Sequence, residues 1–371
     1  MSQKAPTASF SSDPKLDRLC QQLSEEADSP ESEPLWPSRS LELCAENGVF
    51  AWFIGKSHDG KGWSSRQITE GYLALSQACL KTAFIITQRT AATKRIENST
   101  NEPLKRMLLP DLAAGRISTT VGISHLTTSR QHTQPAMQAS PTDGGFLVNG
   151  FSPWVTGGAH ADTIVMGATL EDKRQILFVA KPNQIQDRAG DHLPATIEAA
   201  AHQNLMALTG SHTGAIHVSN LFVPNSDIVN GPVENVIKAA TGGMTGGLPT
   251  STLAIGLASA AVQFIVDEAK RRADLETTAG EFAKQLESAT SQLFALSEGQ
   301  LVCTHQELRQ TANSLVLRAT QAALVAAKGA GYVAGHRVER WCREAMFFLV
   351  WSCPQPVSQA SLCELAGVES F

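Results

Sequence analysis

The feature that most constrains the fold is a change of pattern in the middle of the chain. From residue 117 to residue 224, Val, Ile, Thr and Phe alternate with polar residues, and Pro182, Pro194 and Pro224 punctuate the segment. Alternation with a period of two is typical of β-strands, whereas the flanking segments carry apolar residues at helical spacing. The order α, β, α predicts an α+β protein with a central antiparallel β domain.

The N-terminal segment is predicted to be helical. A capping-type Ser64-Ser65 pair marks one helix start, and Gly115 is a suitable stop for another. We expect helices over residues 14–27, 38–47, 64–96 and 101–115.

The C-terminal segment carries long, Ala-rich stretches with few charges on one face, which is typical of a four-helix bundle. We expect its helices over residues 250–273, 278–301, 305–328 and 337–350. The predicted domains are therefore an α-helical domain over 1–115, a β domain over 116–231 and a helical bundle over 232–371.

Composition limits the partners and the compartment. A net charge of -5 and a pI near 6.1 argue against nucleic acid or an anionic membrane as partner. Residues 239–266 carry no charge, but glycine pairs and Pro249 interrupt them, so we expect a buried helix and no membrane span. Seven scattered cysteines and an N-terminus without an apolar run favour a soluble, cytoplasmic protein with reduced thiols.

The stretch from Gly122 to Asp162 holds the residues best suited to bind a ligand. Two hydroxyl-rich segments, Ser124–Ser129 and Trp154–Thr156, lie on either side of a turn at Pro141–Gly145. An aromatic plate beside hydroxyl groups and glycine backbone suits a flat heterocycle with polar edges. The competing interpretation is that Trp154 is an ordinary core residue of a strand.

Several short motifs occur in an order that resembles one family. They are Asn101–Lys105, Leu109–Gly115, Ser124 with Ser129, Gly150 with Trp154–Thr156, Gly210–Thr213, Arg272 with Phe282, Gly329–Tyr332, Val338–Arg340 and Arg343–Ala345. Singly each motif is a weak signal, but their order and near-gapless spacing resemble the acyl-CoA dehydrogenase superfamily of flavoproteins. The resemblance extends from about residue 35 to the end of the chain.

The resemblance implies an FAD held between the β domain and the C-terminal bundle. In the family, groups at the positions of Ile123, Ser124, Trp154, Val155 and Thr156 bond the isoalloxazine edge, where donors stabilise charge on the reduced ring. The resemblance further implies that Ser129 lies near the pyrophosphate, that Arg272 reaches the FAD of a neighbouring subunit, and that Gly329 permits close backbone approach. For Arg272 the competing interpretation is an ordinary solvated helix charge.

The sequence departs from the family at the catalytic base. The family's usual glutamate position holds Ser352, and the alternative position on the first bundle helix holds Ser251. A serine cannot replace a carboxylate as a lone base. In addition, His125 replaces a family glutamate beside Ser124, and Asp274 lies where a phosphate-bearing cofactor would pass.

Three functional hypotheses follow. The first is a flavin enzyme with a relocated base or a different reaction, such as a flavin-dependent monooxygenase that uses FAD or FMN, with His125 and Ser352 as catalytic candidates. The second is a true dehydrogenase with Glu339 or Glu344 as base, although i to i+4 ion pairs with Arg343 and Arg340 are the simpler expectation. The third is a non-catalytic, oligomeric binding or partner protein.

Other chemistries find no support in the sequence. No phosphate-binding loop, no dinucleotide fingerprint and no metal-ligand spacing occurs, so we predict no metal. The apolar helices predict a small acyl or aromatic substrate without distinguishing the two. The family resemblance implies a homodimer or homotetramer.

Overall fold

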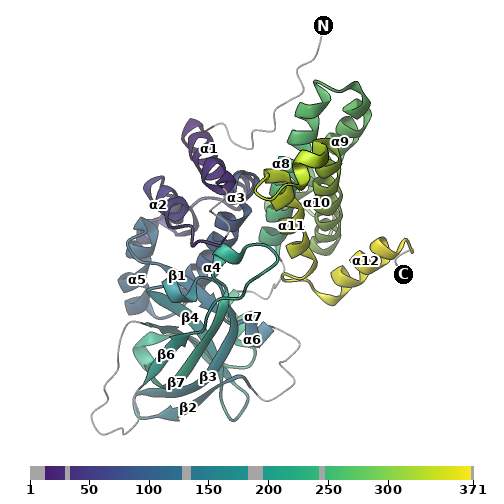
Figure 1. Cartoon of the computed structure of the whole chain (residues 1–371). Helices are drawn as coiled ribbons and strands as arrows, with labels where there is room; N and C mark the ends of the chain where they lie inside the picture. Colours follow the sequence, from purple (N-terminus) through teal and green to yellow (C-terminus); the bar gives the residue numbers. More distant parts are fainter. Residues whose placement is uncertain (1–12, 30–33, 128–134, 183–194, 242–246, 369–371) are drawn as a thin grey trace.

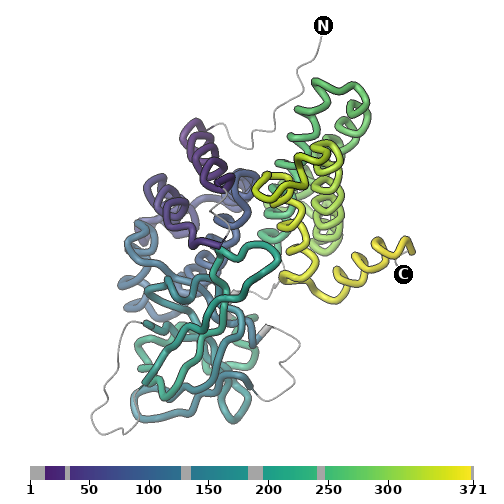
Figure 2. The backbone as a smooth tube through the Cα atoms, in the orientation of Figure 1, coloured from purple at the N-terminus to yellow at the C-terminus, as the bar shows by residue number. Residues whose placement is uncertain are grey.

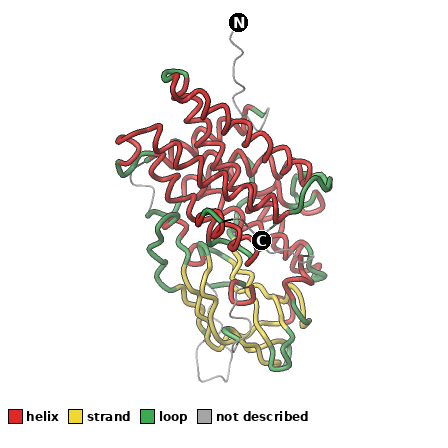
Figure 3. The backbone as a smooth tube through the Cα atoms, turned by 90° about the vertical axis from the view of Figure 1, so that its right-hand side faces the viewer, coloured by secondary structure: helices red, strands yellow, loops and turns green. Residues whose placement is uncertain are grey.

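The computed structural model has helices at one end and a β-sheet at the other (Figures 1 and 3). It describes residues 13–29, 34–127, 135–182, 195–241 and 247–368. Helices from the two ends of the sequence lie together above the sheet, which the central part of the chain forms (Figure 2). The predicted α+β class is therefore confirmed.

The N-terminal helices begin and end close to their predicted positions. They are α1 (Pro14–Asp28), α2 (Ser38–Glu46), α3 (Ser65–Ala78), α4 (Leu80–Glu97) and α5 (Glu102–Ala114). Ser64 and Gln67 form a reciprocal capping box at the start of α3. Gly115 ends α5 with a φ of 72°, a left-handed conformation that favours glycine.

The prediction of one helix from Ser64 to Ile96 was wrong, because Cys79 divides it. Cys79 has extended backbone (φ -156°, ψ 103°) and separates α3 from α4. The two helices pack on different partners: α3 lies against α8, and α4 lies against β1. Tertiary packing sets this break, since the local sequence holds neither glycine nor proline.

The central segment forms one eight-stranded, mainly antiparallel sheet. Its strands are β1 (Thr119–Gly122), β2 (Met137–Thr142), β3 (Gly145–Val155), β4 (Thr163–Thr169), β5 (Gln175–Ala180), β6 (Thr196–Ala199), β7 (Gly214–Pro224) and β8 (Ile228–Val233). The strand order is β6-β7-β3-β2-β4-β5-β8, and β1 pairs in parallel with β4. The expected turn is present as a two-residue Asp143-Gly144 hairpin between β2 and β3.

Alternate residues of the strands serve two separate cores. Val165 packs on one face against α4 and α5, whereas Ile164 and Met166 pack on the other face among strand residues. Both faces of this part of the sheet are therefore buried. Two short helices, α6 (Ser124–Thr127) and α7 (Val236–Thr241), flank the sheet.

The C-terminal part contains the four expected helices and one more. They are α8 (Leu248–Ala269), α9 (Glu276–Ser297), α10 (His305–Ala327) and α11 (Arg337–Met346), followed by α12 (Gln355–Ala366). The last predicted bundle helix ends earlier than expected, at Met346, because the chain tightens into a 3-10 turn over Phe347–Leu349. α12 projects from the bundle towards the C-terminus (Figure 1).

The uncharged segment forms the centre of the helical part. Among the described helices, α8 alone is long and apolar enough to cross a membrane, but 78% of its apolar window is buried inside the protein. It packs against α3, α9 and α10, and one hydrophobic core includes residues of the N-terminal and C-terminal helices alike. Because this core is shared, the division into three domains at residues 115 and 231 stays a prediction.

Candidate functional site

The start of α6 and the end of β3 meet, as the sequence suggested. The backbone N–H of Trp154 donates to the Ser124 hydroxyl at 3.2 Å, and Ser152 Oγ lies 3.4 Å from Ser124 Oγ. Trp154 is 51% exposed although Val155 beside it is fully buried. The interpretation of Trp154 as a core residue was therefore wrong: its ring faces outward.

A chain of buried hydroxyl groups continues from this point. The Thr156 and Thr213 hydroxyls lie 2.9 Å apart, and the Thr213 and Ser211 hydroxyls also lie 2.9 Å apart. The Thr120 hydroxyl donates to the Thr156 carbonyl at 2.7 Å. We call Ser124, Trp154, Val155 and Thr156 the hydroxyl edge, which two strands and a 3-10 turn hold in place.

The turn after the hydroxyl edge depends on Gly157. Its φ is 62°, and a Cβ there would lie 2.4 Å from the Trp36 ring. The Gly157 N–H donates to the carbonyl of Ser211 at 3.0 Å. Ile123, the other predicted edge residue, is 8% exposed and packs into the core beneath β1.

His125 is buried beside the hydroxyl edge, and its side chain reaches β4. Its Nε2 lies 2.8 Å from the Gly167 carbonyl, so this nitrogen must donate the proton. Its Nδ1 is buried and has no partner within the described residues. Burial lowers the pKa of His125, although the bond to Gly167 opposes this effect. The neutral imidazole with a bare Nδ1 is therefore the favoured form.

Arg272 and Gly329 lie at one end of the helical bundle. Arg272 Nη1 donates to the Ala326 carbonyl at 2.8 Å, and Nη2 pairs with Asp274 at 3.0 Å. Gly329 lies three residues after Ala326, in the 3-10 turn Lys328–Tyr332. A Cβ at Gly329 would point into open space. Arg272 is thus bonded to the chain three residues before Gly329 and is more than a solvated helix charge.

Ser352 lies in a turn that a buried arginine holds. Arg309 is 1% exposed and donates to the carbonyls of Trp351 at 3.0 Å and Phe348 at 3.4 Å. Asn313 donates to the same Phe348 carbonyl at 3.0 Å. Burial lowers the pKa of Arg309 to about 10. Ser352 itself has a φ of 44° and is exposed.

The two positions at which the family resemblance implies a base both hold serine: Ser251 is 2% exposed on α8, and Ser352 lies in its turn. Glu339 is paired with Arg343, four residues on, and Glu344 lies 3.8 Å from Arg340. The expected i to i+4 ion pairs are therefore confirmed. Ser129 lies outside the described residues.

Aromatic rings border the Ser352 turn. Phe347 and Trp351 stack with their ring centroids 5.0 Å apart. Phe84 of α4 meets both rings edge-on, at 4.9 Å from Phe347 and 5.1 Å from Trp351. This cluster joins an N-terminal helix to the turn in which a base would be expected.

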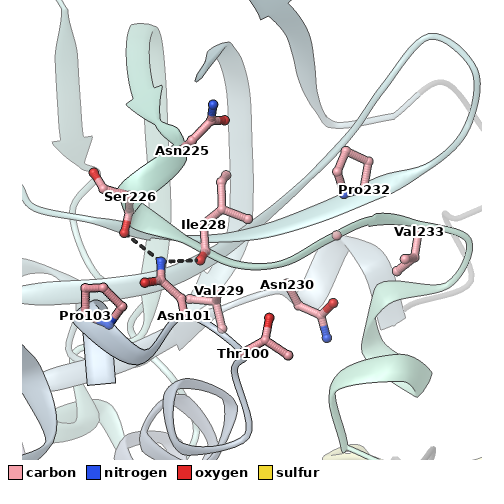
Figure 4. Close-up of a pocket in the computed structure, with 11 residues that line it drawn as sticks. Thr100, Asn101, Pro103, Asn225, Ser226, Ile228, Val229, Asn230, Pro232 and Val233 are labelled. Atoms are coloured by element: carbon pink, nitrogen blue, oxygen red, sulfur yellow. Dashed lines mark hydrogen bonds between the residues drawn. The ribbon is translucent and has the colours of Figure 1, made fainter. Parts of the chain in front are cut away.

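A shallow depression of about 510 Å³ lies elsewhere, between the start of α5 and β8 (Figure 4). There Asn101 Nδ2 donates to the carbonyls of Ser226 at 2.8 Å and Ile228 at 3.0 Å. The bonds fasten α5 to the sheet, and no charged side chain lines the depression. Within the described part of the chain, no group of three or more His, Cys, Asp or Glu residues is arranged to hold a metal ion.

Known proteins resemble this chain in fold and, more weakly, in sequence. No family model matches the chain. The mitochondrial 2-methylacyl-CoA dehydrogenase of Solanum tuberosum is 22% identical over 266 residues, which are 66% of this chain and 61% of that protein.

Solved structures match over almost the whole chain. Glutaryl-coenzyme A dehydrogenase in its glutaryl-CoA complex has a TM-score of 0.78 at 17% identity, covering 97% of both chains. Butyryl-CoA dehydrogenase of Megasphaera elsdenii has a TM-score of 0.76 at 17% identity, covering 95% of this chain and 96% of that one. FMN-bound TdsC of Paenibacillus sp. A11-2 has a TM-score of 0.75 at 15% identity, covering 96% and 98%.

The chain has the acyl-CoA dehydrogenase fold. Within this fold, Ser124 lies next to Trp154, as the sequence suggested, and Arg272 bonds to the Ala326 carbonyl of its own chain. The reach of Arg272 to the FAD of a neighbouring subunit stays a prediction. The sequence did not predict that Arg309 and Asn313 bind the carbonyls of the Ser352 turn, because no local motif marks these two residues. It also missed a cluster of histidines around Trp36, because its members are far apart in the chain.

Proposed function

We propose that this protein is a flavin-dependent oxidoreductase that binds its flavin at the hydroxyl edge, between the sheet and the C-terminal helices. The observation that carries the proposal is the outward-facing Trp154 ring, 51% exposed, in a segment whose neighbours are buried. The acyl-CoA dehydrogenase fold supports it, because the similar structures include proteins described as FAD-dependent or FMN-bound.

The residues present fit a flavin. Trp154 offers an aromatic face, and the Ser124 and Thr156 segments offer hydroxyl and backbone groups at the same edge. When bound, a flavin supplies hydride and single-electron chemistry, to which the protein adds orientation and electrostatics. The buried Thr156–Thr213–Ser211 chain would keep the edge rigid.

The reaction does not use a glutamate at position 352 or 251. Dehydrogenation of an acyl-CoA needs a base for the α-proton, and both positions hold serine. Glu339 and Glu344 are held in ion pairs on α11. We therefore propose a reaction that differs from α,β-dehydrogenation, on a small acyl or aromatic substrate.

The second candidate is a flavin-dependent monooxygenase, which needs no α-proton base. In support, a structure of TdsC with the same fold is described as a complex with FMN and indole. Neutral His125, which follows Ser124 in the chain, has a bare Nδ1 that can accept a proton, whereas the exposed Ser352 hydroxyl is the weaker catalytic candidate.

Flavin titration of the purified protein tests the proposal. We expect FAD or FMN to bind and Trp154→Ala to weaken binding by about 1–3 kcal/mol, the value of one stacked aromatic ring, which is roughly 5- to 150-fold. Leu301→Ala is the matched control, since Leu301 is an apolar side chain 91% exposed in the α9–α10 connection. A protein that takes up neither flavin would refute both enzyme hypotheses and favour a non-catalytic binding protein.

Substrate assays then separate the two reactions. Anaerobic bleaching of the flavin by acyl-CoA thioesters would favour a dehydrogenase. Oxygen consumption that depends on added reduced flavin and an aromatic substrate would favour a monooxygenase. Sedimentation of the loaded protein tests the proposed homodimer or homotetramer, in which Arg272 of one subunit would approach the flavin of the next.

A further inference from the structure

Four aromatic side chains from distant parts of the chain stack beside the hydroxyl edge. Trp36 lies parallel to His160 with ring centroids 4.3 Å apart, and His202 lies parallel to His212 at 4.0 Å. His160 Nε2 and His212 Nδ1 are 2.8 Å apart and join the two stacks. We call Trp36, His160, His202 and His212 the histidine clasp.

The hydrogen bonds fix the protonation of the clasp. His212 Nε2 lies 3.0 Å from the Pro34 carbonyl, which can only accept, so Nε2 carries a proton. In the neutral ring, His212 Nδ1 is then bare and accepts from His160 Nε2–H. One added proton leaves this bond in place, because His160 can shift its own proton to Nδ1 and accept from His212 Nδ1–H. When both rings are cationic, two N–H groups meet head to head and the bond breaks.

The clasp is not built to hold a metal ion. The lone pairs of an imidazole lie in its ring plane, and the His202 and His212 rings are parallel to within 4°. Stacked rings cannot direct their lone pairs at one ion. This geometry instead suits a role that depends on the protonation of the imidazole rings.

The clasp is directly joined to the hydroxyl edge. Gly157, the residue after Thr156, donates its N–H to the carbonyl of Ser211 at 3.0 Å and lies 3.3 Å from that of His212. The Trp36 ring covers Gly157 so closely that a Cβ there would clash at 2.4 Å. Any displacement of Trp36 or His212 therefore reaches the turn that ends the hydroxyl edge.

We propose that the histidine clasp positions the Thr156–Gly157 turn, and that protonation opens the clasp and releases residues 34–36 from the sheet. The part of this proposal in which the clasp regulates the flavin site rests on the proposed function. The part in which the clasp positions the turn does not. Two cationic imidazoles stacked at 4.0 Å repel each other, which adds to the loss of the His160–His212 bond.

The charges around the clasp favour opening at low pH. Partial burial, then His212 and His202, lower the pKa of His160 from its usual 6.5. Asp162, two residues from His160, is bonded to Ser118, and Arg343 of α11 donates to the Met206 carbonyl beside the loop of His202. Residues 34–37 bring no titratable side chain.

The sign follows from proton linkage. Because the pKa of His160 is lowered while the clasp is closed, the open form takes up more protons as the pH falls below about 6.5. Opening is then increasingly favoured as the pH falls from about 6.5 towards the lowered pKa of His160.

Hydrogen exchange tests the clasp without any flavin. We would follow the Ser38 and Gly157 amides, which donate to Trp36 and Ser211 carbonyls. After correction for intrinsic exchange, their protection should fall together as the pH falls below about 6.5. The His212→Ala variant should lack this protection already at neutral pH. If His212→Ala does not fold, His160→Ala removes the other partner of the His160–His212 bond and replaces it in the test.

The control is His217→Gln, which changes a histidine stacked on Phe151 outside the clasp and should behave like the wild type. Protection that does not change with pH in the wild type, or an equal loss in His217→Gln, would overturn the clasp. Flavin affinity measured over the same pH range decides the regulatory part. If flavin binds equally while the clasp opens, the regulation is overturned. If flavin binds at no pH, the proposed function fails and the exchange result still stands.

Discussion

Gly256 of α8 offers the sharpest test of how the two sets of helices join. A Cβ at this position would lie 2.7 Å from the Ser76 Cβ and 2.9 Å from the Leu73 carbonyl oxygen, both on α3. Next to this contact, the Ser76 hydroxyl donates to the buried Leu253 carbonyl at 2.7 Å. The backbones of α3 and α8 therefore touch where only glycine fits.

Gly256→Ala should separate the helices. To bring the new Cβ to an ordinary contact of 3.4 Å from the Ser76 Cβ, α3 and α8 must move apart by about 0.7 Å. A gap of this size loses a quarter to a half of the local dispersion energy. Overpacking costs about 1–3 kcal/mol, and a weakened Ser76–Leu253 bond adds about 1 kcal/mol. The better helix propensity of alanine returns about 1 kcal/mol. We expect a net loss of about 1–3 kcal/mol of unfolding free energy.

Gly280→Ala in α9 is the matched control. Gly280 is also inside a helix, but nothing lies within 4 Å of a Cβ there. This variant should gain about 0.5–1 kcal/mol from helix propensity alone. Urea denaturation followed by circular dichroism gives both midpoints. If both glycine variants move the midpoint upward by the same amount, the close contact between α3 and α8 does not exist.

Three further predictions concern single side chains. Thr156→Val keeps the shape but removes the bond to Thr213, so the unfolding free energy in urea should fall by about 1 kcal/mol. Burial lowers the pKa values of His125 and His160, so below about pH 6.5 the unfolded chain binds more protons than the folded protein. The urea concentration at the unfolding midpoint should therefore be lower at about pH 5.5 than at about pH 7.5. A higher midpoint at the lower pH would contradict this. Ser64→Ala removes a capping box and should cost about 1 kcal/mol in the same assay, whereas an unchanged midpoint would show that α3 does not need its cap.

The fold was predictable where a local signal has one structural meaning. The Ser64 cap, the Gly115 stop and the Asp143-Gly144 hairpin each occur as the residue types require. The change from helical spacing to alternation and back predicted the order of the helical and β segments, and the resemblance to acyl-CoA dehydrogenases agreed with it. Cys79 shows the limit, because two helices with different packing partners meet at a residue that carries no breaking signal.

The candidate site was predictable in part. Ser124 and Trp154 were expected together from their motifs, but the exposure of Trp154 depends on what the sheet leaves uncovered. The bonds His212 makes span 178 residues to Pro34 and 52 residues to His160. No periodic pattern encodes such contacts, since the fold alone brings these loops together.

The buried Arg309 has a consequence for any attempt to place a catalytic carboxylate at position 352. Burial raises the pKa of the neighbouring Cys353 thiol, and the positive charge of Arg309 opposes this rise. A carboxylate placed in this turn by Ser352→Glu would feel the same positive field, which favours its ionised form and weakens it as a base. The φ of 44° at Ser352 is unfavourable for any residue with a Cβ, so a glutamate there would keep this strain. We therefore expect Ser352→Glu alone not to introduce α-proton abstraction, and the turn and Arg309 would have to change with it.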